Sequence, residues 1–183
     1  MNMKVLIACG GTGGHINPGL AIADIIKSKY PDAEFLFAGT PKGMEAKLVP
    51  QAGYKLETIK VAGFQRKISL ENVGRNIKAA AYLVTSGKRA KEIIQGFKPD
   101  IAIGTGGYAA GPVIRKAARM GILTAIHEQN AYPGVTNKLL AKEVDYVMLT
   151  VIEALKFMDK DKFEYSVTGL PVRSNINTMS KAE

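Results

Sequence analysis

Short apolar, β-branched runs alternate with longer amphipathic stretches along the chain, and this alternation constrains the fold more than any other feature. It predicts an α/β fold with a mostly parallel sheet and helices on both faces. The expected strands are residues 4–9, 34–38, 56–61, 100–103, 123–127, 145–149 and 165–168. The expected helices are residues 18–29, 43–52, 70–95, 111–120, 135–142 and 152–158. With 183 residues, the chain is long enough to bury the core of one such domain.

Glycine-rich loops follow the first and fourth expected strands. Residues 10–15 read GGTGGH, residues 104–108 read GTGGY, and the fifth strand ends in HEQN at residues 127–130. Because ligands of such sheets bind at the carboxyl ends of the strands, we expect these three segments on one rim. Both glycine loops lead into helices, with Pro18 and Pro112 near the expected first turns, where a proline loses no hydrogen bond. Each helix would offer free N–H groups and its positive dipole end to an anion.

The loop patterns argue against two common nucleotide sites. A dinucleotide fold needs G-x-G-x-x-G and an acid at the end of the second strand, whereas this chain has GTGGHI and Ala38-Gly39-Thr40. A P-loop needs G-x-x-x-x-G-K-[S/T], and no Lys-Ser or Lys-Thr follows either loop. What remains is a cleft that binds phosphate or sugar through backbone amides.

Titratable side chains beside these loops have several open roles. His15 is a candidate general base, since histidine exchanges protons near neutral pH, or it pins the loop by hydrogen bonding to the backbone. For His127, nearer the strand interior, the structural role is favoured. Glu128 is a base, an orienting partner or a helix-capping carboxylate, and the pattern does not separate these. The two histidines come from separate loops without metal-ligand spacing, so no metal is expected.

Charge and apolar patterning give expectations about compartment and partners. The single cysteine, Cys9, lies in an apolar run, which predicts a buried thiol and fits a reducing cytoplasm. The uncharged, apolar stretch at residues 101–114 is shorter than the ~20 apolar residues of a membrane-spanning helix. The net charge is +9, and residues 60–92 carry eight basic and two acidic side chains. Such a concentration suits a polyanion such as nucleic acid, lipid headgroups or pyrophosphates, or is simply a solvated helix face.

The chain closely resembles the N-terminal half of the MurG family, bacterial glycosyltransferases of peptidoglycan synthesis, in four ordered motifs: GGTGGHINPGLAIA, GTGGYAAGP, HEQNAYPGVTNK and VTGLPVR. The match runs from Met3 to about Arg173. It implies one half of a GT-B fold, in which two Rossmann-like domains face each other across a cleft. Residues 1–168 would form the N-terminal acceptor-binding domain and residues 169–183 the start of the interdomain linker. The C-terminal donor domain would be absent, and the chain would be inactive alone.

The resemblance also implies a reaction, with no cofactor. N-acetylglucosamine would pass with inversion from UDP-N-acetylglucosamine to the muramoyl 4-hydroxyl of lipid I (undecaprenyl-pyrophosphoryl-muramoyl-pentapeptide), giving lipid II. His15 and Glu128 would be the catalytic candidates, with His15 as the base. The implied substrate-binding residues are Thr12, Gly13, Gly14, Gly106, Gly107, Tyr108, Gln129, Asn130, Asn137 and Arg173. The alternative is a non-catalytic membrane adaptor half of a split glycosyltransferase.

For the basic segment, the resemblance implies peripheral binding to the cytoplasmic face of the bacterial cell membrane, which is anionic. Apolar and basic side chains occur together there, and the expected membrane contacts are Phe64, Arg66, Lys67, Ile68, Arg75, Lys78 and Tyr82. Simple packing of the apolar side chains is the competing interpretation. Nucleic-acid binding is not expected, because no aromatic stacking platform accompanies the charge.

Overall fold

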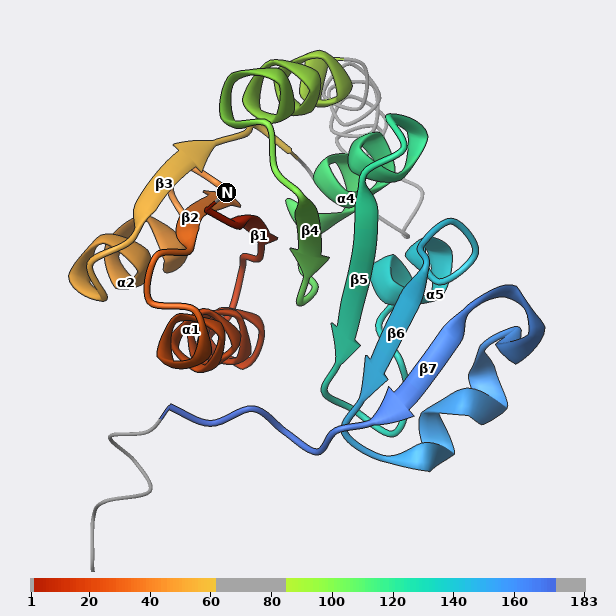
Figure 1. Ribbon diagram of the computed structural model, residues 1–183. Helices are drawn as coiled ribbons and strands as arrows, with labels where there is room; N and C mark the ends of the chain where they lie inside the picture. Colours follow the sequence, from red (N-terminus) through yellow and green to blue (C-terminus); the bar gives the residue numbers. More distant parts are fainter. Residues whose placement is uncertain (1, 62–84, 174–183) are drawn as a thin grey trace, which may run out of the picture.

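A seven-stranded parallel sheet forms the centre of the computed structural model, which describes residues 2–61 and 85–173 (Figure 1). Its strands are β1 (Lys4–Ala8), β2 (Glu34–Gly39), β3 (Lys55–Thr58), β4 (Ile101–Gly104), β5 (Leu123–Glu128), β6 (Tyr146–Leu149) and β7 (Glu164–Val167). They lie side by side in the order β3-β2-β1-β4-β5-β6-β7. All seven predicted strands are confirmed, although β3 ends at Thr58, earlier than expected.

Helices cover both faces of this sheet. They are α1 (Gly13–Lys29), α2 (Glu45–Gln51), residues 85–97, α4 (Ala110–Arg119), α5 (Val135–Leu140), and the 3-10 helices η1 (Ile152–Phe157) and η2 (Lys160–Lys162). The helices α1 and α2 pack on one face, and residues 85–97 pack with α4 and α5 on the other (Figure 1). The helix expected at residues 152–158 is a 3-10 helix. The expected membrane contacts lie outside the described residues: Phe64, Arg66, Lys67, Ile68, Arg75, Lys78 and Tyr82.

The first helix begins earlier than the sequence suggests. Its first residue is Gly13, so the expectation that Pro18 lies in a first turn is wrong. Gly11 adopts a φ of +91° and Thr12 is extended, and together they turn the chain into the helix ahead of the proline. Pro18 lies inside α1, where its missing N–H removes one backbone hydrogen bond. Pro112, in contrast, lies in the first turn of α4 as expected.

The inner strand β1 is buried on both faces, as parallel strands under helices require. Val5 and Ile7 pack in the cluster beneath α1 and α2, whereas Leu6 and Ala8 pack in the opposite one. Cys9 continues the first set and is fully buried, which confirms the predicted buried thiol. Burial, with a further contribution from the charge of Glu45, raises the pKa of Cys9 to about 12, so this thiol stays neutral.

The strand order places the topological switch point between β1 and β4. From β1 the chain builds β2 and β3 on one side, then crosses to β4 and continues outward on the other. Open α/β sheets bind ligands where the connections diverge in this way. Both glycine-rich loops leave the sheet at this point. Within residues 2–61 and 85–173, no helix is long and apolar enough to cross a membrane.

Candidate functional site

The two glycine-rich loops touch each other. A Cβ atom on Gly107, whose φ is +82°, would lie 2.1 Å from the carbonyl oxygen of Gly10. A Cβ atom on Gly106, whose φ is +110°, would lie 2.7 Å from Nδ1 of His15. Thr105 adds a tether, since its hydroxyl donates a hydrogen bond to the carbonyl oxygen of His15 at 2.7 Å. The prediction that both loops share one rim is therefore confirmed.

One glycine of the first loop and two glycines near the end of β2 make room for a buried carboxylate, Glu45. Cβ atoms on Gly10, Gly39 or Gly43 would each lie 2.5 Å or less from the side chain of Glu45. Oε2 of Glu45 accepts a hydrogen bond from the Gly11 amide at 3.1 Å. Oε1 accepts hydrogen bonds from the amide and hydroxyl of Thr40 at 2.7 and 2.6 Å. Glu45 therefore holds the first glycine loop in place through the Gly11 amide.

The charge state of Glu45 follows from these contacts. Burial raises the pKa of its carboxyl, but the hydrogen bonds from Thr40 and Gly11 outweigh burial and hold the pKa below the ordinary value of 4.5. The carboxylate is thus ionised near neutral pH. No distinctive motif marks Glu45. Gly39 and Gly43 are near it in sequence, but Gly10 reaches it only because β1 pairs with β2.

Replacing Glu45 by glutamine is expected to destabilise the chain by roughly 2–4 kcal/mol, because the new NH₂ group faces backbone N–H donors. Urea denaturation of the 183-residue chain measures this cost. Since the folded state lowers the pKa of Glu45, its stabilisation is fully present above about pH 4.5 and is lost as the pH falls through the folded value. In the variant, this part of the pH dependence should be missing.

The matched control is Glu34→Gln, because the Glu34 side chain is half exposed and its ion pair with Lys4, at 3.8 Å, is long. Exposed pairs contribute about 0–1 kcal/mol, so little destabilisation is expected. Equal costs for the two substitutions would show that Glu45 does not anchor the loop.

A hydrogen-bonded series links His15 to the end of β5. Nδ1 of His15 lies 3.1 Å from Oε1 of Gln129. Nε2 of Gln129 donates to the carbonyl oxygens of Thr105 and His127 at 2.9 Å and lies 3.2 Å from Nδ1 of His127. Nε2 of His127 lies 3.0 Å from the carbonyl oxygen of Gly169. His127 is fully buried, and burial lowers its pKa against smaller opposing effects of Gly169 and Glu128, which supports its structural role.

Glu128 organises the segment that follows β5. It is 1% exposed, and Oε1 accepts hydrogen bonds from the amide and the side-chain nitrogen of Asn130 at 2.9 and 3.1 Å. Oε2 accepts hydrogen bonds from the Gly134 amide at 3.1 Å and from Asn137 Nδ2 at 2.8 Å. Of the roles left open by the sequence, these contacts favour the orienting partner. A catalytic role for Glu128 stays a prediction, as does substrate contact by the buried Asn137.

The exposed residues of the rim come from all three segments. Thr12, Gly14, Tyr108 and Asn130 are exposed, and Tyr108 shows 63% of its surface to solvent. Thr12 precedes α1 without a side-chain cap, and its carbonyl oxygen accepts a hydrogen bond from the His15 amide at 3.1 Å, which leaves the amides of Gly13 and Gly14 at the start of the helix. The structure therefore gathers most of the predicted substrate-binding residues around His15. Their contact with a substrate stays a prediction.

Arg173 does not lie beside His15 with the other predicted site residues but pairs with a side chain further along α1. Its Nε pairs with Oδ2 of Asp24 in α1 at 3.1 Å, and Oδ1 of Asp24 accepts a hydrogen bond from the Tyr54 hydroxyl at 2.7 Å. Asp24 follows His15 by nine residues, which is about 13 Å along the helix at 1.5 Å per residue. After β7 the chain thus runs back past the carboxyl end of β5, where Gly169 contacts His127, to α1 (Figure 1). Donor contact by Arg173 stays a prediction.

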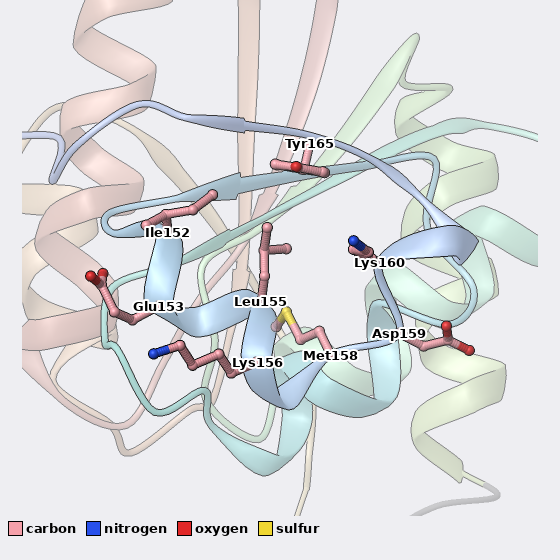
Figure 2. Close-up of a pocket in the computed structure, with 8 residues that line it drawn as sticks. All are labelled: Ile152, Glu153, Leu155, Lys156, Met158, Asp159, Lys160 and Tyr165. Atoms are coloured by element: carbon pink, nitrogen blue, oxygen red, sulfur yellow. The ribbon is translucent and has the colours of Figure 1, made fainter.

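A groove of about 660 Å³ lies at the outer edge of the sheet, beside β7. Figure 2 shows Leu155 of η1 pointing towards Tyr165 of β7, with Lys160 on the same side. None of the predicted site residues lines this groove. Across the described part of the chain, no group of three or more His, Cys, Asp or Glu side chains is placed to hold a metal ion.

The chain is similar to a known family of glycosyltransferases. Residues 5–149 match the model of the glycosyltransferase family 28 N-terminal domain. A relative from Acetivibrio thermocellus is 50% identical over 98% of this chain and 47% of its own length. One from Ruminiclostridium cellulolyticum is 53% identical over 95% of this chain and 46% of its own length. Both are named UDP-N-acetylglucosamine–N-acetylmuramyl-(pentapeptide) pyrophosphoryl-undecaprenol N-acetylglucosamine transferase. The chain spans about half the length of these curated relatives.

Solved structures of glycosyltransferases contain a domain of the same fold. The crystal structure of Acinetobacter baumannii MurG is 29% identical, with a TM-score of 0.68 over 81% of this chain and 41% of that one. A UDP-glucosyltransferase from Polygonum tinctorium is 13% identical, with a TM-score of 0.62 over 100% of this chain and 55% of that one, and shows the fold alone. The predicted fold class and the resemblance stated from the four motifs are confirmed.

Proposed function

Since the chain belongs to glycosyltransferase family 28 through the N-terminal domain at residues 5–149, we propose that it is the acceptor-binding half of an inverting N-acetylglucosaminyltransferase. The complete transferase moves N-acetylglucosamine from UDP-N-acetylglucosamine to the muramoyl 4-hydroxyl of lipid I, giving lipid II for peptidoglycan. The names of the two relatives describe this donor and a pyrophosphoryl-undecaprenol acceptor. The observation that carries the proposal is the contact of both glycine loops at the switch point, with His15 against Gly106.

The chemistry assigns a role to each part of the rim. In an inverting transfer, the acceptor oxygen attacks the anomeric carbon while its bond to UDP breaks, so a base takes the hydroxyl proton and the diphosphate leaves as an anion. His15 takes the proton. The amides of Gly13 and Gly14 and the positive dipole ends of α1 and α4 face the acceptor pyrophosphate, for which helix N-termini are suited. Tyr108 and Asn130, both exposed, contact sugar hydroxyls.

Membrane association is the second part of the proposal. The relatives' acceptor carries an undecaprenol chain, so the reacting sugar is held near a lipid surface. The segment from Phe64 to Tyr82 supplies apolar and basic side chains suited to an anionic cytoplasmic leaflet. Co-sedimentation of the chain with vesicles should require anionic lipid, and binding that is indifferent to lipid charge would contradict this part.

A fusion of all 183 residues to the unmatched half of the Acetivibrio thermocellus relative is expected to transfer N-acetylglucosamine to a soluble lipid I analogue. The 183-residue chain alone should bind the analogue without turnover, because the fusion partner supplies the donor site. The relative itself is the positive control, and its unmatched half alone is the negative one.

Two outcomes would count against the assignment. If the chain does not bind the analogue and the fusion does not transfer the sugar, while the relative is active, the whole proposal is contradicted. Turnover by the chain alone would contradict its role as one half. A membrane adaptor of a split enzyme would support transfer that does not depend on His15.

A further inference from the structure

Gly169, His127, Gln129 and His15 form a hydrogen-bonded series, and the donor of each bond follows from the carbonyl group of Gly169. The carbonyl oxygen of Gly169 only accepts, so Nε2 of His127, 3.0 Å away, must carry the proton. Burial lowers the pKa of His127, so the ring is neutral and its Nδ1 is an acceptor. His127 is fully buried and thus held in this arrangement.

The hydrogen-bond partners also decide which end of the Gln129 side-chain amide is the oxygen and which is the NH₂ group, since the two have nearly the same shape. One end faces three acceptors: the carbonyl oxygens of Thr105 and His127, and Nδ1 of His127. Only the NH₂ group suits that position. The amide oxygen must therefore face Nδ1 of His15 at 3.1 Å, and since this oxygen cannot donate, Nδ1 of His15 carries the proton.

We propose that Gln129 is a positioning residue that holds His15 in its Nδ1–H tautomer and leaves the lone pair on Nε2. Its catalytic consequence rests on the proposed function, because Nε2 is then the atom that takes the acceptor's proton. A base oriented by a third group is a recurring arrangement in enzymes. Here the third group is a neutral amide, so it sets the tautomer of the histidine without adding a negative charge beside it.

Two further contacts restrict the ring. The hydroxyl of Thr105 donates to the carbonyl oxygen of His15, which ties the backbone of α1 to the loop after β4. The absence of a side chain at Gly106 gives the Nδ1 edge of the ring its space, since a Cβ atom there would lie 2.7 Å away. Gln129 therefore meets a ring whose position is already set, and decides which nitrogen bears the proton.

The chain has two histidines, so its imidazole spectrum is simple enough to test this directly. Long-range ¹H–¹⁵N correlation of the ¹⁵N-histidine-labelled chain distinguishes the tautomers, and His15→Ala assigns the signals. In the unchanged chain we expect Nδ1–H for His15 and Nε2–H for His127. Gln129→Met should move His15 towards the Nε2–H form that free imidazole prefers, because it removes the oxygen that faces Nδ1.

His127 serves as an internal check, because collapse of the site would alter both rings, whereas loss of the Gln129 acceptor alters the His15 tautomer. Gln51→Met, at an exposed position in α2, is the matched substitution and should change neither ring. An Nε2–H tautomer of His15 in the unchanged chain, or an Nδ1–H tautomer that survives Gln129→Met, overturns the proposal.

The fusion gives the second readout. Gln129→Met should lower kcat by roughly 10-fold or more with little change in KM, because general-base catalysis contributes about 10²–10⁴-fold and only the tautomer of the base is disturbed. A change confined to KM would overturn the positioning role. If the tautomers behave as expected and the fusion shows no transfer, the proposed function fails while the assignment of the His15 tautomer stands.

Discussion

Replacing His15 by alanine is expected to lower kcat of the fusion by roughly 10²–10⁴-fold, the usual contribution of a general base in the transition state. The residue is the third of α1, its ring lies against Gly106, and its Nδ1 is occupied by Gln129. One ring nitrogen, Nε2, is left to receive a proton. Steady-state kinetics with UDP-N-acetylglucosamine and a soluble lipid I analogue measure the loss.

Binding separates the two roles left open for His15. If the side chain moves a proton, the 183-residue His15→Ala chain should bind the acceptor analogue within a few-fold of the unchanged chain. A raised KM with unchanged kcat would instead assign His15 to positioning of the acceptor. If neither kcat nor KM changes, His15 has no role in the mechanism.

Gly107→Ala is expected to destabilise the chain by about 3 kcal/mol or more, because two costs add. A left-handed backbone costs an alanine about 1–2 kcal/mol. In addition, the new methyl group would lie 2.1 Å from the carbonyl oxygen of Gly10, and a backbone atom cannot rotate away as a side chain can. The loops would have to separate, and urea denaturation of the 183-residue chain would report the cost.

Gly53 offers a closely matched control. Its φ is also +82°, but nothing lies within 4 Å of the position that a Cβ atom would take. Gly53→Ala should therefore show only the backbone cost. The difference between the two variants isolates the contact between the loops, and equal destabilisation would contradict the closeness of Gly107 to Gly10. In the fusion, Gly107→Ala should also impair acceptor binding, whereas Gly53→Ala should not.

Local pattern was sufficient for the fold. Inner strands buried under helices need apolar runs, so β1, β2, β4, β5 and β6 were visible in the sequence, and the more exposed edge strands β3 and β7 were marked by the alternation with helices. The parallel arrangement followed from the helices between the strands. That arrangement also predicted a shared rim for the loops around Gly10, Gly106 and Gln129. The start of α1 was misplaced because proline marks first turns only on average, and here Gly11 and Thr12 turn the chain into the helix earlier.

The sequence by itself therefore determined the elements of the sheet, the rim on which the loops lie, and His15 as a candidate base. Tertiary structure alone decided which groups hold them: Glu45 among glycines from three places in the chain, Gln129 between two histidines, and Arg173 on Asp24. Periodicity and propensity act over a few neighbouring residues, whereas three of these pairs are far apart in sequence: Gly10 and Glu45, His15 and Gln129, and Asp24 and Arg173. The first two pairs meet because the strand order puts the ends of β2, β1, β4 and β5 side by side, and the third because the chain after β7 returns to α1.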